Sequence, residues 1–472
     1  MSLVAQETKP ESHLKELGMD LTTGSIPKNL LVFSLPMLAG SILQTAYSLI
    51  NAFWVGKYLG TNALAAITVS FPAVFVLMAI AGGLTIASNI LVAQYVGARE
   101  WDALKKVIQT SIILVLSLSV VFLALGLIFS PHLLQMMNTP EEILPISIQY
   151  LRIFFWTLPF SFTIFLLGAI LRGIGDSRTP LYFQAVSVAL NTILDPVLIF
   201  GWVGLPRLGL NGTAYASILA QALVVIGLLI YIPLKRPLVS ADWRNLRIDL
   251  PSLWLIFRIG FPAMVQQSVV SVSLLFIVSL VSAFGANADA AIGAAVRIDN
   301  VAFLPALTIG MAVSTLSGQN IGAVKYERVK EVFWWGILLS GGISFLISLL
   351  AVSMPKIFLK AFLSEPQVIS IGADYLRIVG INYTLFAVMF VSNGVINGSG
   401  HTLPTTIITI IALWGIRIPI AYLLSKHLND VRGVWYAMLL SVFCGMMISL
   451  FYYASGRWKK PVIKRQHGII QS

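Results

Sequence analysis

The sequence has little charge, one cysteine and no apolar leader. Only 11% of its 472 residues are charged, whereas soluble domains carry about 25%, so most of the chain is expected to lie in lipid. The single cysteine, Cys444, excludes an intrachain disulfide and a metal site built from several cysteines. The first 25 residues are polar, and we interpret them as a cytoplasmic tail rather than a signal peptide.

Clustered aspartates are also missing. No DDxxD-like motif occurs in the chain, and an enzyme that handles a diphosphate through Mg²⁺, such as a prenyl transferase, needs clustered carboxylates of that kind. We therefore expect a protein that is not an enzyme and has no cofactor.

Long apolar runs are what the sequence contains instead. They recur along nearly the whole chain, in which 57% of residues are hydrophobic, and each is about 20 residues or more, enough to cross roughly 30 Å of hydrocarbon. The pattern predicts an all-α, polytopic membrane protein with twelve spans, at residues 28–56, 61–85, 107–130, 147–171, 180–202, 211–234, 251–284, 288–315, 333–355, 373–397, 404–426 and 432–455.

The distribution of basic residues predicts the orientation. The net charge of +12 comes from Lys and Arg in short loops, which is typical of membrane topology rather than of a nucleic-acid-binding face. With the N-terminus inside, few basic residues fall outside: Lys57, Arg207, Lys356, Lys360, Lys426 and Arg432. We therefore expect both termini in the cytoplasm and the protein in the plasma or inner membrane.

The chain contains an internal repeat. QYVGAREWDALKKV (94–107) matches QNIGAVKYERVKEV (319–332), YLRI recurs at 150 and 375, and the glycines of RGIG and NGSG match at 173 and 398, always 225 residues apart. Each half holds six spans, so the halves insert in parallel around a central cleft, as in alternating-access transporters. The predicted parts are an N-terminal tail, an N-lobe, a linker, a C-lobe and a basic C-terminal tail, at 1–27, 28–234, 235–250, 251–455 and 456–472.

One aspartate lies inside an apolar span, in the stretch NTILDPVLIFG (191–201). Asn191 is one turn before Asp195 on the same helix face, and Pro196 removes an amide donor, which leaves the carbonyl of Thr192 free. A carboxylate, an amide and a free carbonyl suit Na⁺, and the carboxylate alone suits a proton. The alternative is an aspartate that is hydrogen-bonded to neighbouring helices and only maintains a kink.

Other polar residues are expected at similar depth. Gln44 and Asn51 lie on one face of the first span, and Thr213 lies near the start of the sixth. The seventh and tenth spans have no carboxylate beyond their ends, so coupling is expected in the N-lobe. Arg297 and Asp299 are two residues apart and cannot face each other, and a transport role for Asp299 stays open.

These segments together resemble the multidrug and toxic compound extrusion (MATE) family. The resemblance rests on LPMLAGSILQTAYSLINAFWVGKYLG, ALAAITVSFP, GQNIGA, NTILDPVLIFG and the paired YLR segments, and it covers about 28–455. It implies two pseudo-symmetric six-helix bundles around a V-shaped cleft and cation-coupled antiport of organic substrates. Within the family the chain is most similar to the branch that includes DinF and its archaeal relatives.

The resemblance also implies roles for single residues. Asp195 matches the essential carboxylate of the fifth helix, Asn191 its partner amide and Thr213 a sixth-helix hydroxyl, while Asn51 stands where a second aspartate is usual. The implied cation site is Asp195, Asn191, Asn51 and Thr213, with Asp195 as the ligand if Na⁺ is used. The implied substrate cavity contains Gln44, Tyr47, Asn51 and Tyr150, and the helix hinges are Pro36, Pro196 and Pro262.

The expected function is export of cationic amphipathic drugs or metabolites in exchange for one H⁺ or Na⁺. We expect a monomer whose partners are the lipid bilayer and small organic substrates. The main alternative is a lipid-linked oligosaccharide flippase of the same wider superfamily, which should have a strongly cationic central cleft. Here the arginines cluster at helix ends, which favours the antiporter.

Overall fold

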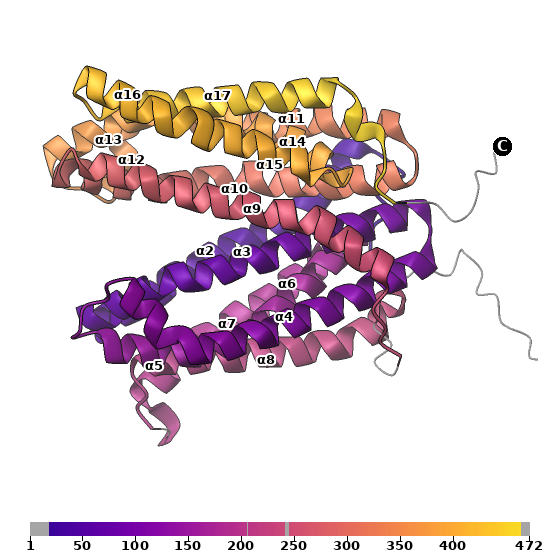
Figure 1. Cartoon of the computed structure of the whole chain (residues 1–472), viewed down its shortest axis with the longest axis horizontal. Coiled ribbons are helices and arrows are strands. Elements are labelled where there is room, and N and C mark those ends of the chain that lie inside the picture. The colour runs from indigo at the N-terminus through magenta and orange to yellow at the C-terminus, as the bar shows by residue number, and fades with distance from the viewer. Residues whose placement is uncertain (1–17, 205, 241–244, 464–472) are drawn as a thin grey trace, which may run out of the picture. The chain divides into compact units, whose positions relative to one another are not determined.

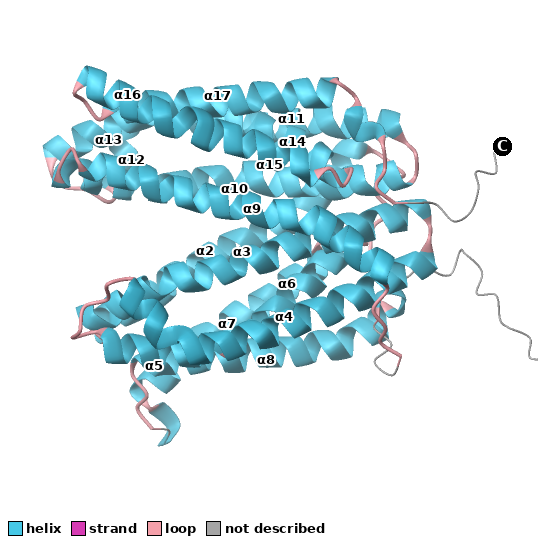
Figure 2. Cartoon of the chain, in the orientation of Figure 1, coloured by secondary structure: helices cyan, strands magenta, loops and turns pink. Residues whose placement is uncertain are grey.

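The computed structural model describes residues 18–204, 206–240 and 245–463, and the described residues form helices and connecting loops without any strand (Figure 2). Parts of the two predicted tails (1–17 and 464–472) and of the predicted linker (241–244) lie outside the described residues. The all-helical class predicted from the sequence is confirmed.

Within its described part, the first half of the chain forms seven α-helices, which Figure 1 labels. Their bounds are α2 Ile26–Tyr58, α3 Thr61–Ala98, α4 Trp101–Met136, α5 Leu144–Phe155, α6 Leu158–Gly173, α7 Arg178–Phe200 and α8 Leu210–Lys235, with short 3₁₀ turns at η1 Trp202–Gly204 and η2 Pro237–Val239. Five of the first six predicted spans fall within one of these helices or, for α5 and α6, within a bent pair of them, and the span predicted at 180–202 extends two residues past the end of α7.

The second half follows the same plan. Its helices are α9 Leu250–Ser282, α10 Ala286–Gly322, α11 Tyr326–Ser353, α12 Pro355–Lys360, α13 Pro366–Val379, α14 Asn382–Gly398, α15 Thr402–Ile410, the π-helical segment η3 Ile411–Arg417, α16 Ile418–Leu428, α17 Arg432–Ala454 and the 3₁₀ turn η4 Arg457–Lys459. Among the described residues, ten helices are long and apolar enough to span a membrane, or up to twelve spans if each bent pair counts as one.

Backbone geometry repeats at the offset seen in the sequence. The α5–α6 pair bends by 44° and the α13–α14 pair by 41°, and both breaks occur at corresponding positions in the two halves. Arg99 and Val324, also 225 residues apart, both adopt positive φ angles, 57° and 60°. Because few non-glycine residues take this conformation, its recurrence supports a duplicated fold.

The repeated glycines also have one physical reason. A Cβ on Gly173 would lie 2.6 Å from a side-chain atom of Val92 on α3, and one on Gly398 would lie 2.4 Å from the carbonyl oxygen of Ser314 on α10. In each half, therefore, a helix approaches its neighbour too closely for any side chain at this position.

The chain forms two compact units. Of the described residues, the first unit contains 18–20, 39–96, 100–204, 206–240 and 245–257, and the second contains 21–38, 97–99 and 258–463. In the first unit α8 packs against α7, α5 and α6, and α4 packs against α5 and α6; α4 and α8 are labelled in Figure 1. In the second unit α10 is central and packs against α11, α13 and α14.

Apolar side chains also cover outward faces of the helices. On α4, for example, Leu125, Ile128 and Phe129 are exposed, and on α11 Leu338, Phe345 and Leu346 are exposed. Contiguous apolar surface of this extent is not compatible with water, whereas it matches a bilayer. The structure is therefore that of a membrane-spanning helical protein.

Candidate functional site

Asp195 is the one acidic residue of the predicted site, and it is buried. Its side chain is 0% exposed on α7, and neither carboxylate oxygen has a hydrogen-bond partner among the described residues. An ionised carboxylate without any partner in a buried position is strongly unfavourable. The described residues therefore supply no hydrogen-bond partner of the kind that the alternative, an aspartate that only maintains a kink, requires.

Asn191 lies one turn earlier on α7 and is held by two hydrogen bonds. Its amide nitrogen donates to the carbonyl oxygen of Ser187 (2.9 Å), and its amide oxygen accepts from the Tyr47 hydroxyl on α2 (3.2 Å). Tyr47 and Tyr150 both lie within electrostatic range of the Asp195 carboxylate. The phenol of Tyr47 thus connects the amide beside Asp195 to the neighbouring helix.

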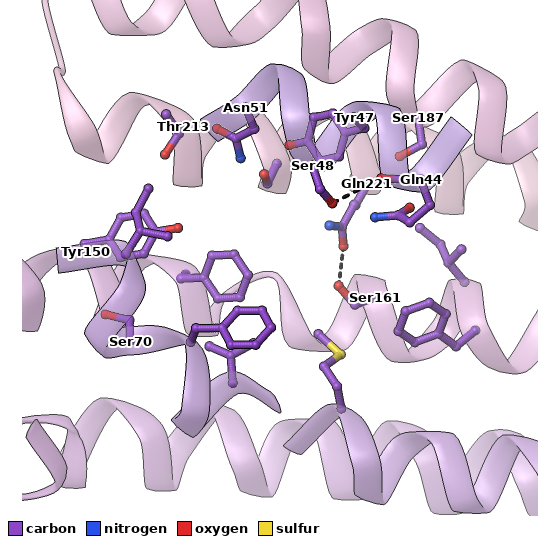
Figure 3. Close-up of a pocket in the computed structure, with 18 of the residues that line it drawn as sticks. Gln44, Tyr47, Ser48, Asn51, Ser70, Tyr150, Ser161, Ser187, Thr213 and Gln221 are labelled. Atoms are coloured by element: carbon purple, nitrogen blue, oxygen red, sulfur yellow. Dashed lines mark hydrogen bonds between the residues drawn. The ribbon is translucent and has the colours of Figure 1, made fainter. Parts of the chain in front are cut away.

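A cavity of about 410 Å³ adjoins this group within the first unit. Figure 3 shows the side chains that surround it, among them Tyr47, Asn51, Tyr150 and Thr213. The cavity is lined by Gln44, Tyr47, Ser48, Asn51, Leu64, Ile67, Ser70, Phe71, Val74, Met78, Tyr150, Phe154, Ser161, Ile164, Phe165, Gln184, Ser187, Thr213, Ser217 and Gln221. None of these lining residues is charged, so the cavity offers amides, hydroxyls and aromatic rings.

The structure brings together the residues that the sequence singled out. Gln44, Tyr47, Asn51, Tyr150 and Thr213 all line the cavity, while Asn191 and Asp195 are buried and are not among its lining residues. The oxygen of the Asn51 amide has no partner among the described residues. The three proline positions proposed as hinges, Pro36, Pro196 and Pro262, lie inside the continuous helices α2, α7 and α9.

Several cavity residues were not predicted from the sequence, although a helical stripe would have found them. On α2, Gln44, Tyr47, Ser48 and Asn51 follow i, i+3, i+4, i+7 spacing, which places them on one helix face. Gln184, Ser187, Asn191 and Asp195 form such a stripe on α7, and Thr213, Ser217 and Gln221 form one on α8. The cavity lies where these polar stripes face each other.

Two side-chain hydrogen bonds join the helices around the cavity. Gln184 donates to the side-chain oxygen of Gln44 (2.5 Å), which joins α7 to α2, and Ser161 on α6 donates to Gln221 on α8 (2.5 Å; Figure 3). Tyr150 on α5 interacts with Thr213 on α8. The polar residues of five helices are thus arranged around one space.

The second unit contains a buried aspartate of a different kind. Asp299 on α10 accepts hydrogen bonds from the hydroxyls of Tyr375 on α13 and Tyr383 on α14, the latter at 2.6 Å. Arg417, which donates to Ser441 (2.9 Å), lies within electrostatic range of Asp299. This carboxylate is already satisfied by fixed protein groups, in contrast to Asp195.

Comparison with known proteins identifies the family. The MatE family model matches the chain twice, over residues 36–197 and 262–423. The two matches follow the internal repeat and together cover more than half of the chain. The chain belongs to the MatE family.

Relatives of this MatE protein match over almost the entire length. The probable multidrug resistance protein YoeA of Bacillus subtilis (strain 168) is 34% identical over 445 residues, which cover 93% of this chain and 96% of the relative. The probable multidrug resistance protein YpnP of the same organism is 31% identical and covers 93% of this chain and 97% of its own length. The chain is therefore a membrane transporter whose relatives are multidrug resistance proteins.

Solved structures show the same fold. An outward-facing multidrug resistance MATE family transporter of the MOP superfamily superimposes with a TM-score of 0.87 at 23% identity and covers 93% of this chain and 97% of its own. A MOP superfamily transporter from Pyrococcus furiosus gives 0.86 at 24% identity and covers 94% of this chain and 99% of its own. At this identity the agreement concerns the fold alone.

Proposed function

We propose that this MatE transporter exports organic cations of amphipathic character in exchange for H⁺ or Na⁺, with Asp195 as the coupling residue. The observation that carries the proposal is the buried Asp195 carboxylate, which has no hydrogen-bond partner in the described part of the chain and lies near a cavity lined by uncharged polar and aromatic side chains. A single carboxylate becomes neutral with one H⁺ or one Na⁺, which supports one-for-one exchange. We propose that Asn191, Asn51 and Thr213 supply the neutral oxygens of this cation site.

The cavity suits the proposed substrates. Aromatic faces attract organic cations through cation–π interactions, and Phe71, Tyr150, Phe154 and Phe165 line the cavity together with the adaptable side chain of Met78. A cationic substrate and the coupling cation would both be favoured by the negative charge of Asp195. Because both draw on one charge, we propose that they compete, and that cation uptake expels the substrate.

Coupling also requires that the cation bind one transport state better than the other. Tyr47 can link cation binding to the cavity, because its hydroxyl donates to Asn191 and its side chain lines the cavity. We propose that ion binding reorders this contact and moves α2 and α7 around Pro36 and Pro196. In this proposal the protein acts as a monomer in the plasma membrane, with both termini in the cytoplasm and no cofactor.

A flippase for lipid-linked oligosaccharides is the competing function. Such a substrate carries phosphates and calls for basic residues along its path. The 410 Å³ cavity beside Asn191 has none among its lining residues, which favours the export of cations over that of anionic lipid-linked sugars.

The test is efflux of a fluorescent organic cation from proteoliposomes with pH and sodium gradients imposed separately. Asp195→Asn should abolish gradient-driven efflux while the protein still binds the dye. The matched control is Asp299→Asn, which alters a buried aspartate whose partners are already within the protein and should keep gradient-driven efflux. Efflux by Asp195→Asn that still responds to either gradient would refute the assignment.

A further inference from the structure

A second cavity lies in the first unit, away from the coupling site. It has a volume of about 340 Å³ and opens between α4, α5 and α8. Its lining residues are Leu127, Arg152, Ile153, Trp156, Tyr215 and Ile218. The side chains of Trp156 and Tyr215 are 51% and 40% exposed, and exposed Leu125 and Ile128 lie nearby on α4. The cavity is thus a groove, here called the α4–α5–α8 groove, on an apolar surface of the type that faces lipid.

The groove contains one cation, Arg152. Its Nε donates to the hydroxyl of Ser130 on α4 (3.2 Å), which fixes the guanidinium in place. No carboxylate lies within the ion-pair distance of 4.0 Å among the described residues. Within the described part of the chain, this arginine on an apolar face therefore has no carboxylate as an ion-pair partner.

The internal repeat supplies a comparison. Arg377 is the counterpart of Arg152 in the second half, and it pairs with Asp374 three residues earlier, at 3.6 Å. The residue that corresponds to Asp374 in the first half is the uncharged Gln149. Arg377 thus has a carboxylate within ion-pair distance, one that it shares with Arg432 (2.9 Å), whereas Arg152 has none among the described residues, although the two helices follow the same plan.

We propose that the α4–α5–α8 groove binds an anionic phospholipid, with its phosphate on the Arg152 guanidinium. The guanidinium has further N–H donors beyond the one used by Ser130, and arginine and phosphate form strong, charge-assisted hydrogen bonds. Trp156 and Tyr215 have the aromatic, half-polar character that favours the headgroup level of a bilayer. Leu127, Ile153 and Ile218 provide an apolar wall for the glycerol and the start of the acyl chains.

This inference is independent of the proposed antiport, because the groove contains none of the residues assigned to the cation or the drug. It also differs from simple snorkelling of an arginine to the interface. Snorkelling applies equally to Arg152 and Arg377 and does not select a headgroup charge. A built site at Arg152 selects a net negative lipid and is specific to the first half.

The test is native mass spectrometry of the full-length protein in detergent, titrated with phosphatidylglycerol or with phosphatidylcholine of the same acyl chains. Wild type and Arg377→Gln should retain one phosphatidylglycerol more tightly than phosphatidylcholine. Arg152→Gln should lose this preference, with phosphatidylglycerol binding weakened by roughly tenfold or more, the size expected for one charge-assisted contact. An addition of sn-glycerol 3-phosphate should not displace the lipid, because the apolar wall contributes to binding.

Two further variants keep the test decisive if Arg152→Gln folds poorly. Arg152→Lys keeps the charge and should retain most of the preference. Gln149→Asp installs the carboxylate that Asp374 provides in the second half, and it should remove the preference while the arginine is still present. Equal affinity of wild type for both lipids, an equal loss in Arg377→Gln, displacement by sn-glycerol 3-phosphate or an unchanged preference in Gln149→Asp would each overturn the proposal.

Discussion

Removal of one hydroxyl, in Tyr47→Phe, should separate cation coupling from drug binding. The Tyr47 hydroxyl donates to the Asn191 amide oxygen at 3.2 Å, and this is the contact that orients the amide beside Asp195. A neutral hydrogen bond contributes about 0.5–1.5 kcal/mol, which corresponds to a change in affinity of roughly twofold to tenfold. We therefore expect the concentration of the coupling cation that gives half-maximal efflux to rise by about that factor.

Drug binding should respond differently to the same change. Phenylalanine keeps the aromatic ring that lines the cavity. The affinity for a fluorescent organic cation should therefore change by no more than about twofold, which is at the low end of the effect of losing one neutral hydrogen bond. Both quantities are measurable on one preparation, by dye binding in detergent and by efflux from proteoliposomes over a range of pH and sodium.

Tyr231→Phe is the matched control. Its hydroxyl lies 3.4 Å from that of Thr179, near the opposite end of α7, outside the cavity. The substitution removes a tyrosine hydroxyl from the same unit and should leave both dye affinity and cation dependence unchanged. If Tyr47→Phe weakens the dye while the cation dependence stays as in wild type, the proposed link between the phenol and the ion site is wrong.

Two further predictions concern stability and pH. Gly398→Ala should lower the free energy of unfolding by about 1–3 kcal/mol through overpacking, because its Cβ would lie 2.4 Å from the Ser314 carbonyl oxygen. The control is Gly293→Ala on α10, where a Cβ meets nothing within 4 Å and no such loss is expected. Thermal unfolding in detergent compares the two variants. Burial and two nearby cations lower the pKa of His401, in the turn before α15, below its usual value of 6.5. The unfolded chain then binds a proton more readily than the folded one, so stability should fall as the pH drops below about 6.5, and His401→Gln should reduce that loss without altering proton-driven efflux.

The sequence predicted the membrane spans well because hydropathy depends only on local composition. It did not predict where the helices end: α3 continues to Ala98 and α10 to Gly322, beyond the ends of the predicted spans at residues 85 and 315. The added part of α3 is itself largely apolar, and Val74–Ala98 is apolar enough to span a membrane, so the end of an apolar run does not mark the end of the helix. The sharp turn that follows each of these two helices, at Arg99 and Val324, is a property of backbone geometry that no apolar pattern encodes.

The candidate site was predictable along each helix and unpredictable between helices. The spacing of Asn191 and Asp195 is local, so their shared face follows from helix geometry. The contact of Tyr47 with Asn191 joins positions 144 residues apart, and the two tyrosines that bind Asp299 come from two other helices. Such contacts depend on how helices pack, which is set by many side chains together.

The difference between the two units lies in how a buried carboxylate is satisfied. The repeat places a tyrosine at equivalent positions, Tyr150 and Tyr375, and each lies near an aspartate of its own unit, Asp195 on α7 and Asp299 on α10. The Tyr375 hydroxyl donates a hydrogen bond to Asp299, whereas no described residue donates one to Asp195. A carboxylate that is bound by fixed donors gains little from an incoming ion, and one without donors gains a great deal. We therefore expect the exchangeable cation in the first unit, even though each unit contains a buried acid.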